Sequence, residues 1–324
     1  NAASTIVDAG GANQRVMVVK ANGVRVSGLT ITRGSYTSVD DGRGGGINIV
    51  GSSGVEIRDC IIASNRCAES NTGGSTLGGG IRALNSSVVI SNCLIFSNQT
   101  AGGSAGYSLG AGVHAGNGSM TMTRTILKNN SGSGWANAAA IQGGGFYNGG
   151  GAVFLANCLF SGNQATHIAG AVAAGYSGQT ILYNSTVAGN GGGLYGAGGS
   201  FAVTNCIVWG NGDDVTGAVT LAWCDIEDGD NNGTNGCFSA DPLFVDTNYY
   251  HEASHAGCYS NGYFSGGSWI NTEFSSPCID AGDNGSPYAE EPYPTGRRVN
   301  IGAYGNTTVA SKTYGSSGSI MMIR

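Results

Sequence analysis

The sequence predicts an all-β fold, a parallel β-helix of about eight turns followed by a C-terminal cap. First, a motif with a glycine run, two short apolar segments and an asparagine recurs through residues 24–226. Second, each copy is too short to bury its own apolar face, so the copies must stack on one another. Third, the apolar residues alternate with polar ones, as in strands, and no window has a helical period with caps.

The clearest copies of the motif span residues 44–65, 78–98 and 143–163. Each begins with three glycines, continues with an apolar-x-apolar strand and a Cys, and ends with Asn. Weaker copies keep the same frame, and their spacing shortens towards the C-terminal end. The first strand residue of the frame falls at Val24, Val55, Val88, Met120, Val153, Thr180, Phe201 and Val219.

Each copy has a part of constant length and a part of variable length. From the residue after the glycine run to the Asn there are 17 positions in both Ile81–Asn98 and Phe146–Asn163. From the Asn to the next copy there are 16 positions in Asn65–Ile81 and 4 in Asn190–Leu194. The sequence therefore predicts core strands in the constant part and a loop on one side of the solenoid in the variable part.

Two columns of residues follow from this frame, and we interpret both as architecture. Asn tolerates a left-handed backbone, and stacked amides can hydrogen-bond along an axis. The predicted asparagine ladder contains Asn65, Asn98, Asn130, Asn163, Asn190 and Asn211. A small buried side chain fits a tight inward corner. The predicted inward column of small residues contains Cys60, Cys93, Thr125, Cys158, Ser185, Cys206 and Cys224.

The amino-acid composition limits which binding partners and which cellular location are expected. Glycine accounts for 59 of 324 residues, only 10% are charged, and the formal net charge is −6. Without a basic stripe, nucleic acid is not an expected partner. No apolar run is long enough for a membrane span. The chain starts at Asn1, which indicates a removed signal peptide or a piece of a longer protein, and the composition suits a secreted, extracellular or cell-surface setting.

The cysteines leave more than one interpretation open. The nine cysteines have no CxxC spacing, so zinc is not expected. Cys67, Cys237, Cys258 and Cys278 lie outside the inward column, and pairing of Cys258 with Cys278 is one option among several.

The composition shifts after residue 226, where aromatic residues and prolines accumulate. We predict a β-helix over residues 1–226, a capping region over 227–310 and a tail over 311–324. The aromatic and aliphatic residues expected to cover the open end of the core are Leu243, Phe244, Val245, Trp269, Ile279 and Tyr304.

The tail ends in a short apolar segment after a Gly-Ser linker. That segment contains Ile320, Met321, Met322 and Ile323. Added as a strand to the uncovered first turn of a second copy, it would give a head-to-tail filament. Alternatively, the tail packs on its own cap, or a longer protein continues at both ends.

Three blocks of the C-terminal region resemble a known family. DPLFVD at 241–246, SPCIDAGD at 276–283 and RVNIGAYGN at 298–306 are similar, in that order, to the tail of bacterial right-handed parallel β-helix proteins of the choice-of-anchor Q class. The repeats are also similar to those of polymorphic outer-membrane adhesins. The resemblance implies a right-handed helix and a secreted or surface-attached bacterial protein, and it implies no activity.

A polysaccharide lyase or hydrolase is the enzymatic alternative. Such chemistry on an acidic glycan needs carboxylates together with Lys or Arg in one groove. The best cluster of charged residues consists of Asp40, Asp41, Arg43, Arg66, Glu69 and Arg82. The same residues can equally be solvated charges on surface loops.

Calcium is the one cofactor that the sequence suggests. Asp228, Asp230 and Asn232 match the first half of an EF-hand loop, but Ser239 stands where the bidentate Glu is expected. A polar turn before the cap explains these residues as well.

Two classes of function follow. The first is a non-enzymatic extracellular or cell-surface protein that is structural or adhesive, including a self-assembling fibre subunit. Its partners would be further copies of itself, head to tail, or a surface glycan. The second is a carbohydrate-active enzyme. The sparse charge in the repeats favours the first.

Overall fold

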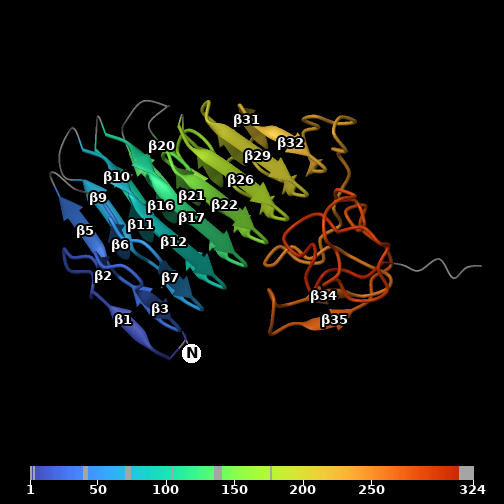
Figure 1. The fold of residues 1–324 in the computed structure, drawn as a ribbon, viewed down its shortest axis with the longest axis horizontal. Helices are drawn as coiled ribbons and strands as arrows, with labels where there is room; N and C mark the ends of the chain where they lie inside the picture. The colour runs from blue at the N-terminus through green and yellow to red at the C-terminus, as the bar shows by residue number, and fades with distance from the viewer. Residues whose placement is uncertain are drawn as a thin grey trace, which may run out of the picture.

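The computed structural model describes residues 2, 4–38, 43–69, 74–103, 106–134, 141–175 and 177–313. The described residues form strands, turns and irregular segments and contain no helix, so the prediction of an all-β chain is confirmed. Most strands belong to long parallel sheets that run side by side along the molecule (Figure 1).

We name the three long sheets by their place in the repeat. The glycine sheet follows each glycine run, the frame sheet carries the aligned frame residue, and the flank sheet follows the column of small residues. The glycine sheet contains β2 (Met17–Val19), β6 (Ile47–Val50), β11 (Ile81–Leu84), β16 (Val113–Ala115), β21 (Phe146–Asn148), β25 (Val172–Ala174), β28 (Leu194–Gly196) and β31 (Val215–Gly217).

The other two long sheets have the same order of repeats. The frame sheet contains β3 (Arg25–Ser27), β7 (Val55–Arg58), β12 (Ser86–Ser91), β17 (Gly118–Thr123), β22 (Ala152–Ala156), β26 (Gln179–Tyr183), β29 (Ser200–Thr204) and β32 (Thr220–Ala222). The flank sheet contains β1 (Ile6–Asp8), β4 (Thr30–Thr32), β8 (Ile61–Ala63), β13 (Leu94–Phe96), β18 (Ile126–Lys128), β23 (Leu159–Ser161), β27 (Thr186–Ala188), β30 (Ile207–Trp209) and β33 (Asp225–Ile226).

The register between strands is the one that the frame predicts. Val55 pairs with Val88, Val88 with Met120, and Met120 with Val153. In each repeat the chain passes through the glycine, frame and flank sheets in the same order and then pairs in parallel with the previous repeat. This topology is compatible with a parallel β-helix. The side chains between the sheets form one apolar core that extends from Val19 to Cys237.

The variable segments are not simple loops, and this part of the prediction is wrong. Their described residues form a five-stranded and a three-stranded parallel sheet, because backbone groups stacked one repeat apart can hydrogen-bond to each other. These sheets contain β5 (Ser35–Ser38), β9 (Arg66–Glu69), β14 (Gln99–Gly102), β19 (Ser131–Gly134) and β24 (Gln164–Ala165), and β10 (Thr76–Leu77), β15 (Ser108–Leu109) and β20 (Ile141–Gln142).

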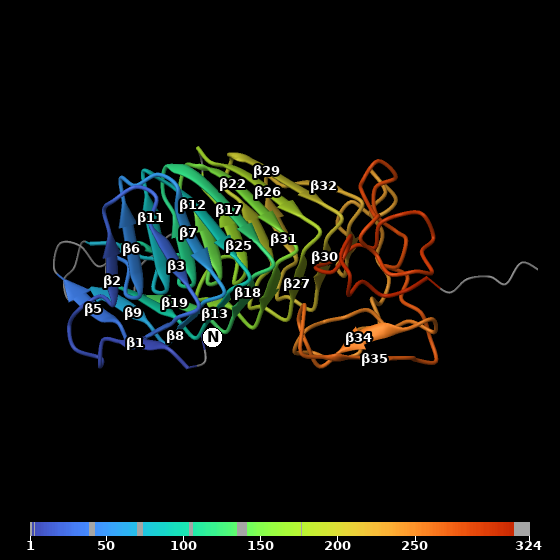
Figure 2. The same ribbon diagram turned by 60° about the horizontal axis from the view of Figure 1, so that its bottom comes forward.

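The C-terminal region, residues 227–313, lies beside the last repeats (Figures 1 and 2). It is mostly irregular and includes the antiparallel pair β34 (Cys258–Ser260) and β35 (Ser268–Ile270). Asn157 donates hydrogen bonds from Nδ2 to the carbonyl oxygens of Ala303 and Gly305, at 3.0 and 2.9 Å. The region therefore packs along the side of the sheets.

Cys237 and Phe238 continue the stack at the end of the repeat core, and two of the residues expected to cover that end lie elsewhere. Phe238 N–H donates to the Cys224 carbonyl at 2.9 Å, and Phe238 forms a parallel bridge with Asp225. Stacking thus continues for one more step, and Cys237 joins the core. Tyr304 instead belongs to a separate cluster inside the C-terminal region, and Trp269 is 41% exposed.

Candidate binding groove on the flank sheet

The flank sheet carries an outward row of mostly apolar side chains. The middle residue of each strand points into the core, so the first residue points out. This row contains, in register, Thr30, Ile61, Leu94, Ile126, Leu159, Thr186, Ile207 and Asp225. Apolar residues on an outer face need a second layer if they are to leave water.

The C-terminal region is that second layer over half of the row. Leu159 and Ile207 are fully buried, and Ile207 packs against Ile301 and Cys278. Ala303 N–H donates to Thr186 Oγ1 at 2.9 Å. Further towards the N-terminal end, Ile126 is still buried, at 7% exposure. The next two residues of the row, Leu94 and Ile61, are only half-buried.

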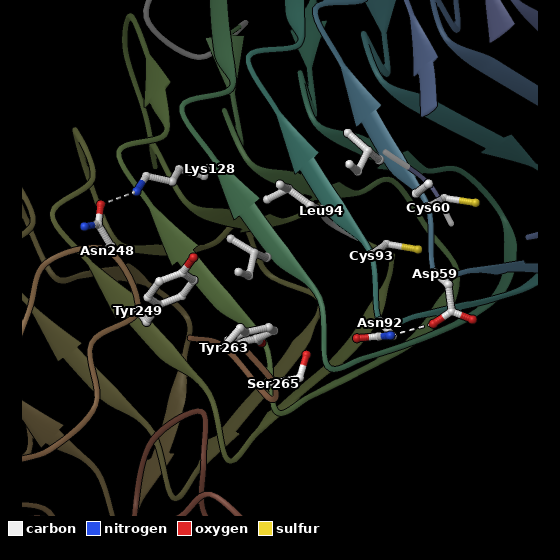
Figure 3. A pocket seen from close by; sticks show the side chains of 13 residues that line it. Asp59, Cys60, Asn92, Cys93, Leu94, Lys128, Asn248, Tyr249, Tyr263 and Ser265 are labelled. Atoms are coloured by element: carbon white, nitrogen blue, oxygen red, sulfur yellow. Dashed lines mark hydrogen bonds between the residues drawn. The ribbon is translucent and has the colours of Figure 1, made fainter. Parts of the chain in front are cut away.

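A cavity of about 670 Å³ begins where this cover ends (Figure 3). Its floor is the outward row at Ile61, Leu94 and Ile126, and Tyr249 and Tyr263 of the C-terminal region form the opposite wall. We call it the flank groove. It joins two parts of the chain that lie more than a hundred residues apart in the sequence.

Polar side chains line the rim of the flank groove. Lys128 Nζ donates to Asn248 Oδ1 at 3.3 Å, and Asn92 Nδ2 donates to Asp59 Oδ1 at 2.5 Å (Figure 3). Tyr263 OH donates to the Asn157 carbonyl at 2.8 Å, which holds its ring in the wall of the groove. The groove can therefore accept an apolar ligand with polar groups along its edges.

Two thiols lie directly behind the groove. Cys60 and Cys93 both contribute to its lining, although they are 1% and 4% exposed. The hydrogen bond from the neighbouring Cys93 thiol lowers the pKa of Cys60 to about 7, and the same contact together with burial raises the pKa of Cys93. Cys60 is thus the more acidic thiol of the pair.

The six asparagines of the predicted ladder form one chain of hydrogen bonds between repeats. Each Nδ2 also donates to a core-strand carbonyl, as Asn98 does to Ile62 at 2.9 Å. The amide-to-amide bonds from Nδ2 to Oδ1 are Asn65 to Asn98 (3.0 Å), Asn98 to Asn130 (3.0 Å), Asn130 to Asn163 (2.9 Å), Asn163 to Asn190 (3.0 Å) and Asn190 to Asn211 (2.9 Å).

The backbone reason given for the ladder is wrong. None of the six asparagines has a positive φ; the left-handed residue is the one before each of them, such as Ser64 (φ 55°) or Ser97 (φ 54°). The preceding residue makes the corner and aims the amide inwards. Asparagine is therefore present for its side-chain hydrogen bonds rather than for its backbone tolerance.

The ladder ends on an acid that sequence reasoning missed. Asn211 Nδ2 donates to Asp214 Oδ1 at 2.9 Å, and burial raises the pKa of Asp214 to about 6. Asp214 and Asp228 accept each other's backbone N–H through their carboxylates, at 3.2 and 3.3 Å. The sequence did offer one signal for this contact, since Asp214 follows the last asparagine of the ladder by three residues.

The predicted calcium residues lie in the turn that follows the last repeat. Asp230 N–H donates to Asp228 Oδ1 at 3.3 Å, and both residues belong to a run of turns with Asn232. Within the described ranges, no three or more His, Cys, Asp or Glu side chains are grouped so that they could hold a metal ion. Calcium at this turn stays a prediction.

The structure brings only part of the predicted lyase cluster together. Asp40 and Asp41 lie outside the described residues. Arg82 and the buried His114 are neighbours in register on the glycine sheet. Burial is the main cause that lowers the pKa of His114, to about 3, and the positive charges of Arg82 and Arg43 lower it further.

Arg43 forms a parallel bridge with Leu77 of β10, and the other two members of the cluster lie on the five-stranded sheet. Arg66 and Glu69 are the first and last residues of β9, and Arg66 is exposed. Arg82 is 3% exposed and donates to Asn48 Oδ1 at 3.1 Å. The arrangement does not present these charges together on an open face.

The column of small residues is buried along its whole length and is one member longer than predicted. Cys237 follows Cys224 in the stack, since Phe238 bridges to Asp225. Cys237 was hard to recognise as a member of the column from the sequence, because turns precede it where the earlier repeats have strands. All nine cysteines are buried and none forms a disulfide, so the suggested pairing of Cys258 with Cys278 is not present.

Two further points concern partners. The described part of the chain has no helix with the length and apolar character needed to cross a bilayer. The tail segment Ile320–Ile323, predicted to donate a strand, lies outside the described residues.

Comparison of the chain with models of protein families, with curated proteins and with solved structures gave no match.

Proposed function

We propose that the chain is a right-handed parallel β-helix that acts outside the cell as a non-enzymatic structural or adhesive scaffold. The parallel sheets and the register support the helix, and the right hand rests on the resemblance of the tail blocks. The stacked hydrogen bonds of the asparagine ladder make such a rod stiff.

The observation that carries the proposal is the outer face of the frame sheet. The row of outward positions starts with the ion pair of Arg25 and Glu56 and is uncharged from the third strand onward, in register: Val89, Thr121, Phe154, Ile181, Ala202 and Thr220. Phe154 and Ile181 are each 38% exposed. Apolar side chains gathered on a regular face mark an interaction surface, and neutral hydroxyls beside them suit a neutral or weakly charged partner.

The partner of this face would be an extracellular glycan surface or another copy of the chain. Head-to-tail stacking into fibres is the second form of the same proposal. It uses the exposed edge at β1, where Ile6 is 59% exposed.

The test measures adhesion and cleavage in the same samples. We expect the purified protein to be retained on polysaccharide-coated surfaces, and the double variant Phe154→Asp with Ile181→Asp to be retained at least fivefold less, because charge on this face opposes burial. Val18→Asp, which places the same charge on the outer face of the glycine sheet, where Val18 is 48% exposed, is the matched control. Reducing ends and unsaturated sugars are assayed alongside. Their release by the wild type, and its loss in Arg82→Ala, would favour the carbohydrate-active enzyme instead.

A further inference from the structure

We propose that the flank groove binds an extended peptide segment of another chain, in the way that the flank sheet already binds its own residues 299–305. The inference deepens the proposed scaffold function by naming a partner, and it rests on that function only for its biological use.

The intramolecular precedent lies along the corner before the flank sheet. One residue per repeat there has a left-handed backbone, including Asn157 (φ 51°) and Asn184 (φ 41°). Their amides point outwards to peptide groups: Asn157 Nδ2 donates to the carbonyls of Ala303 and Gly305, and Asn184 Nδ2 donates to Gly305 at 3.1 Å. Side-chain amides thus hold the backbone of the docked segment.

The outward row supplies the apolar half of this docking. Ile301 packs on Ile207, and Gly302 approaches the sheet so closely that a Cβ there would lie 2.8 Å from Ile207 Cδ1 and 3.1 Å from Thr186 Oγ1. Gly302 N–H also donates to the Asn205 carbonyl at 2.9 Å. The segment is recognised by its backbone and by one apolar side chain, which requires little of its sequence.

The same two features continue into the flank groove without an occupant among the described residues. Asn92 (φ 52°) is the corner residue of its repeat, as Asn157 is of a later one, and Leu94 is the outward residue, as Thr186 and Ile207 are. Asn92 is exposed and Leu94 half-buried. One hydrogen of the Asn92 amide goes to Asp59, and the second can donate to a peptide carbonyl.

The chemistry of the groove favours a peptide over a glycan. Its floor consists of aliphatic side chains and lacks the hydroxyls that the frame sheet offers at Thr121 and Thr220, whereas a sugar needs many directed polar partners. The polar groups lie at the rim, where a peptide backbone would place its carbonyls and N–H groups. Continuity with an existing peptide interface on the same sheet is the strongest argument, because a regular surface repeats its binding mode at each step.

The experiment uses the full chain and a fluorescent synthetic peptide with the sequence of residues 299–306. Fluorescence anisotropy should show saturable binding with a Kd between about 10 µM and 1 mM. Leu94→Asp should weaken binding at least tenfold, because it puts a charge on the floor. Asn92→Gly, which keeps the left-handed backbone, should weaken it severalfold by removing the amide. Ile181→Asp on the frame sheet is the matched control and should bind normally.

Three results would overturn the proposal: no binding at millimolar peptide, equal binding by Leu94→Asp, or equal binding of a peptide in which Ile301 is replaced by Asp. Cellohexaose, run as a second probe, would reveal a glycan site if it bound and lost binding in Leu94→Asp while the peptide failed. Circular dichroism melts show whether each variant is folded. If the wild-type protein adheres to the surface but does not bind the peptide, this inference is wrong and the scaffold function stands. If the frame-sheet variants adhere as well as the wild type, the scaffold function is wrong and this inference stands on the peptide result.

Discussion

The asparagine ladder of the repeats and the Glu252 carboxyl of the C-terminal region differ in how a buried polar group is satisfied. Asn130, at the centre of the ladder, is fully buried and both donates and accepts: its Nδ2 donates to Asn163 and Ile95, and its Oδ1 accepts from Asn98. Glu252 in the C-terminal region is equally buried, yet neither carboxyl oxygen has a hydrogen-bond partner among the described residues.

The difference follows from periodicity. A residue of the ladder finds its partner in the next copy, so one good hydrogen bond is made many times. A buried group outside the ladder, such as the Glu69 carboxylate, has no such partner in the described part of the chain. The C-terminal region has no copies, and each of its buried groups must find an individual partner. Burial then raises the pKa of Glu252 to about 8 and that of Glu291 to about 7, so that both carboxyls are stable in the protonated form.

This contrast teaches where the molecule should be sensitive. The repeats should be sensitive to the loss of a hydrogen-bonding side chain, and the C-terminal region to close packing and to pH.

The largest expected effect comes from breaking the ladder. Asn130→Leu removes the acceptor of the Asn98 backbone N–H, one of the two acceptors of Asn98 Nδ2, and the side-chain donor to the Ile95 carbonyl. We expect a loss of about 3 kcal/mol or more, since each unsatisfied buried group costs roughly 1–3 kcal/mol. Urea melts measure it. Asn211→Leu, half-buried at the end of the ladder, should cost less, and equal, negligible losses at both sites would refute the ladder's role.

A smaller effect is expected where the two regions meet. Gly302 has φ 97°, and a Cβ there would lie 2.7 Å from Glu252 Oε1. Gly302→Ala should therefore loosen the C-terminal region at a cost of about 1–3 kcal/mol. Gly266→Ala is the control, because Gly266 has φ 79° but nothing within 4 Å of its Cβ position. Limited proteolysis should cut residues 241–313 faster in the first variant only. If both variants were cleaved at the same rate, the positive φ that they share, and not the close contact with Glu252, would explain the result.

The next effect concerns pH. The folded pKa of Glu252 lies above its unfolded value, so its contribution is present at low pH and is lost as pH rises towards about 8. Between pH 7 and 9 stability should fall by about 1.4 kcal/mol for this group. Burial lowers the pKa of His251 to about 4, so this imidazole changes stability only below pH 7 and does not contribute between pH 7 and 9. Glu252→Gln should flatten the pH dependence of melting above pH 7, and an unchanged slope would contradict the assignment.

The smallest effect is a difference in labelling rate within the column of small residues. The pKa of Cys60 is lowered to about 7 by Cys93, whereas burial raises that of Cys158 to about 12. Iodoacetamide at pH 8 should therefore label Cys60 before Cys158 in the native protein, both slowly, and all nine cysteines after unfolding. Peptide mass spectrometry gives the order. Rapid native labelling of Cys158 would show that the inward assignment is wrong.

The flank groove could not be predicted from the sequence. The frame placed Ile61, Leu94 and Ile126 at outward positions, but the pattern does not say what covers them. Tyr249 and Tyr263 carry no periodic signal, and their approach to the sheet depends on contacts such as that of Tyr263 with Asn157. The lyase cluster shows the converse: Arg66 and Arg82 are close in the sequence, yet they belong to different sheets.

The strands, the register and the inward columns follow from the repeat pattern, because each copy has the same short-range pattern and stacking permits only one alignment of the copies. Val88 could pair only with the residue at its own place in the frame. The tertiary structure alone decided how the C-terminal region lies on the flank sheet and how Cys237 extends the core. These contacts join unlike segments once each, and a contact that occurs once leaves no period in the sequence by which to recognise it.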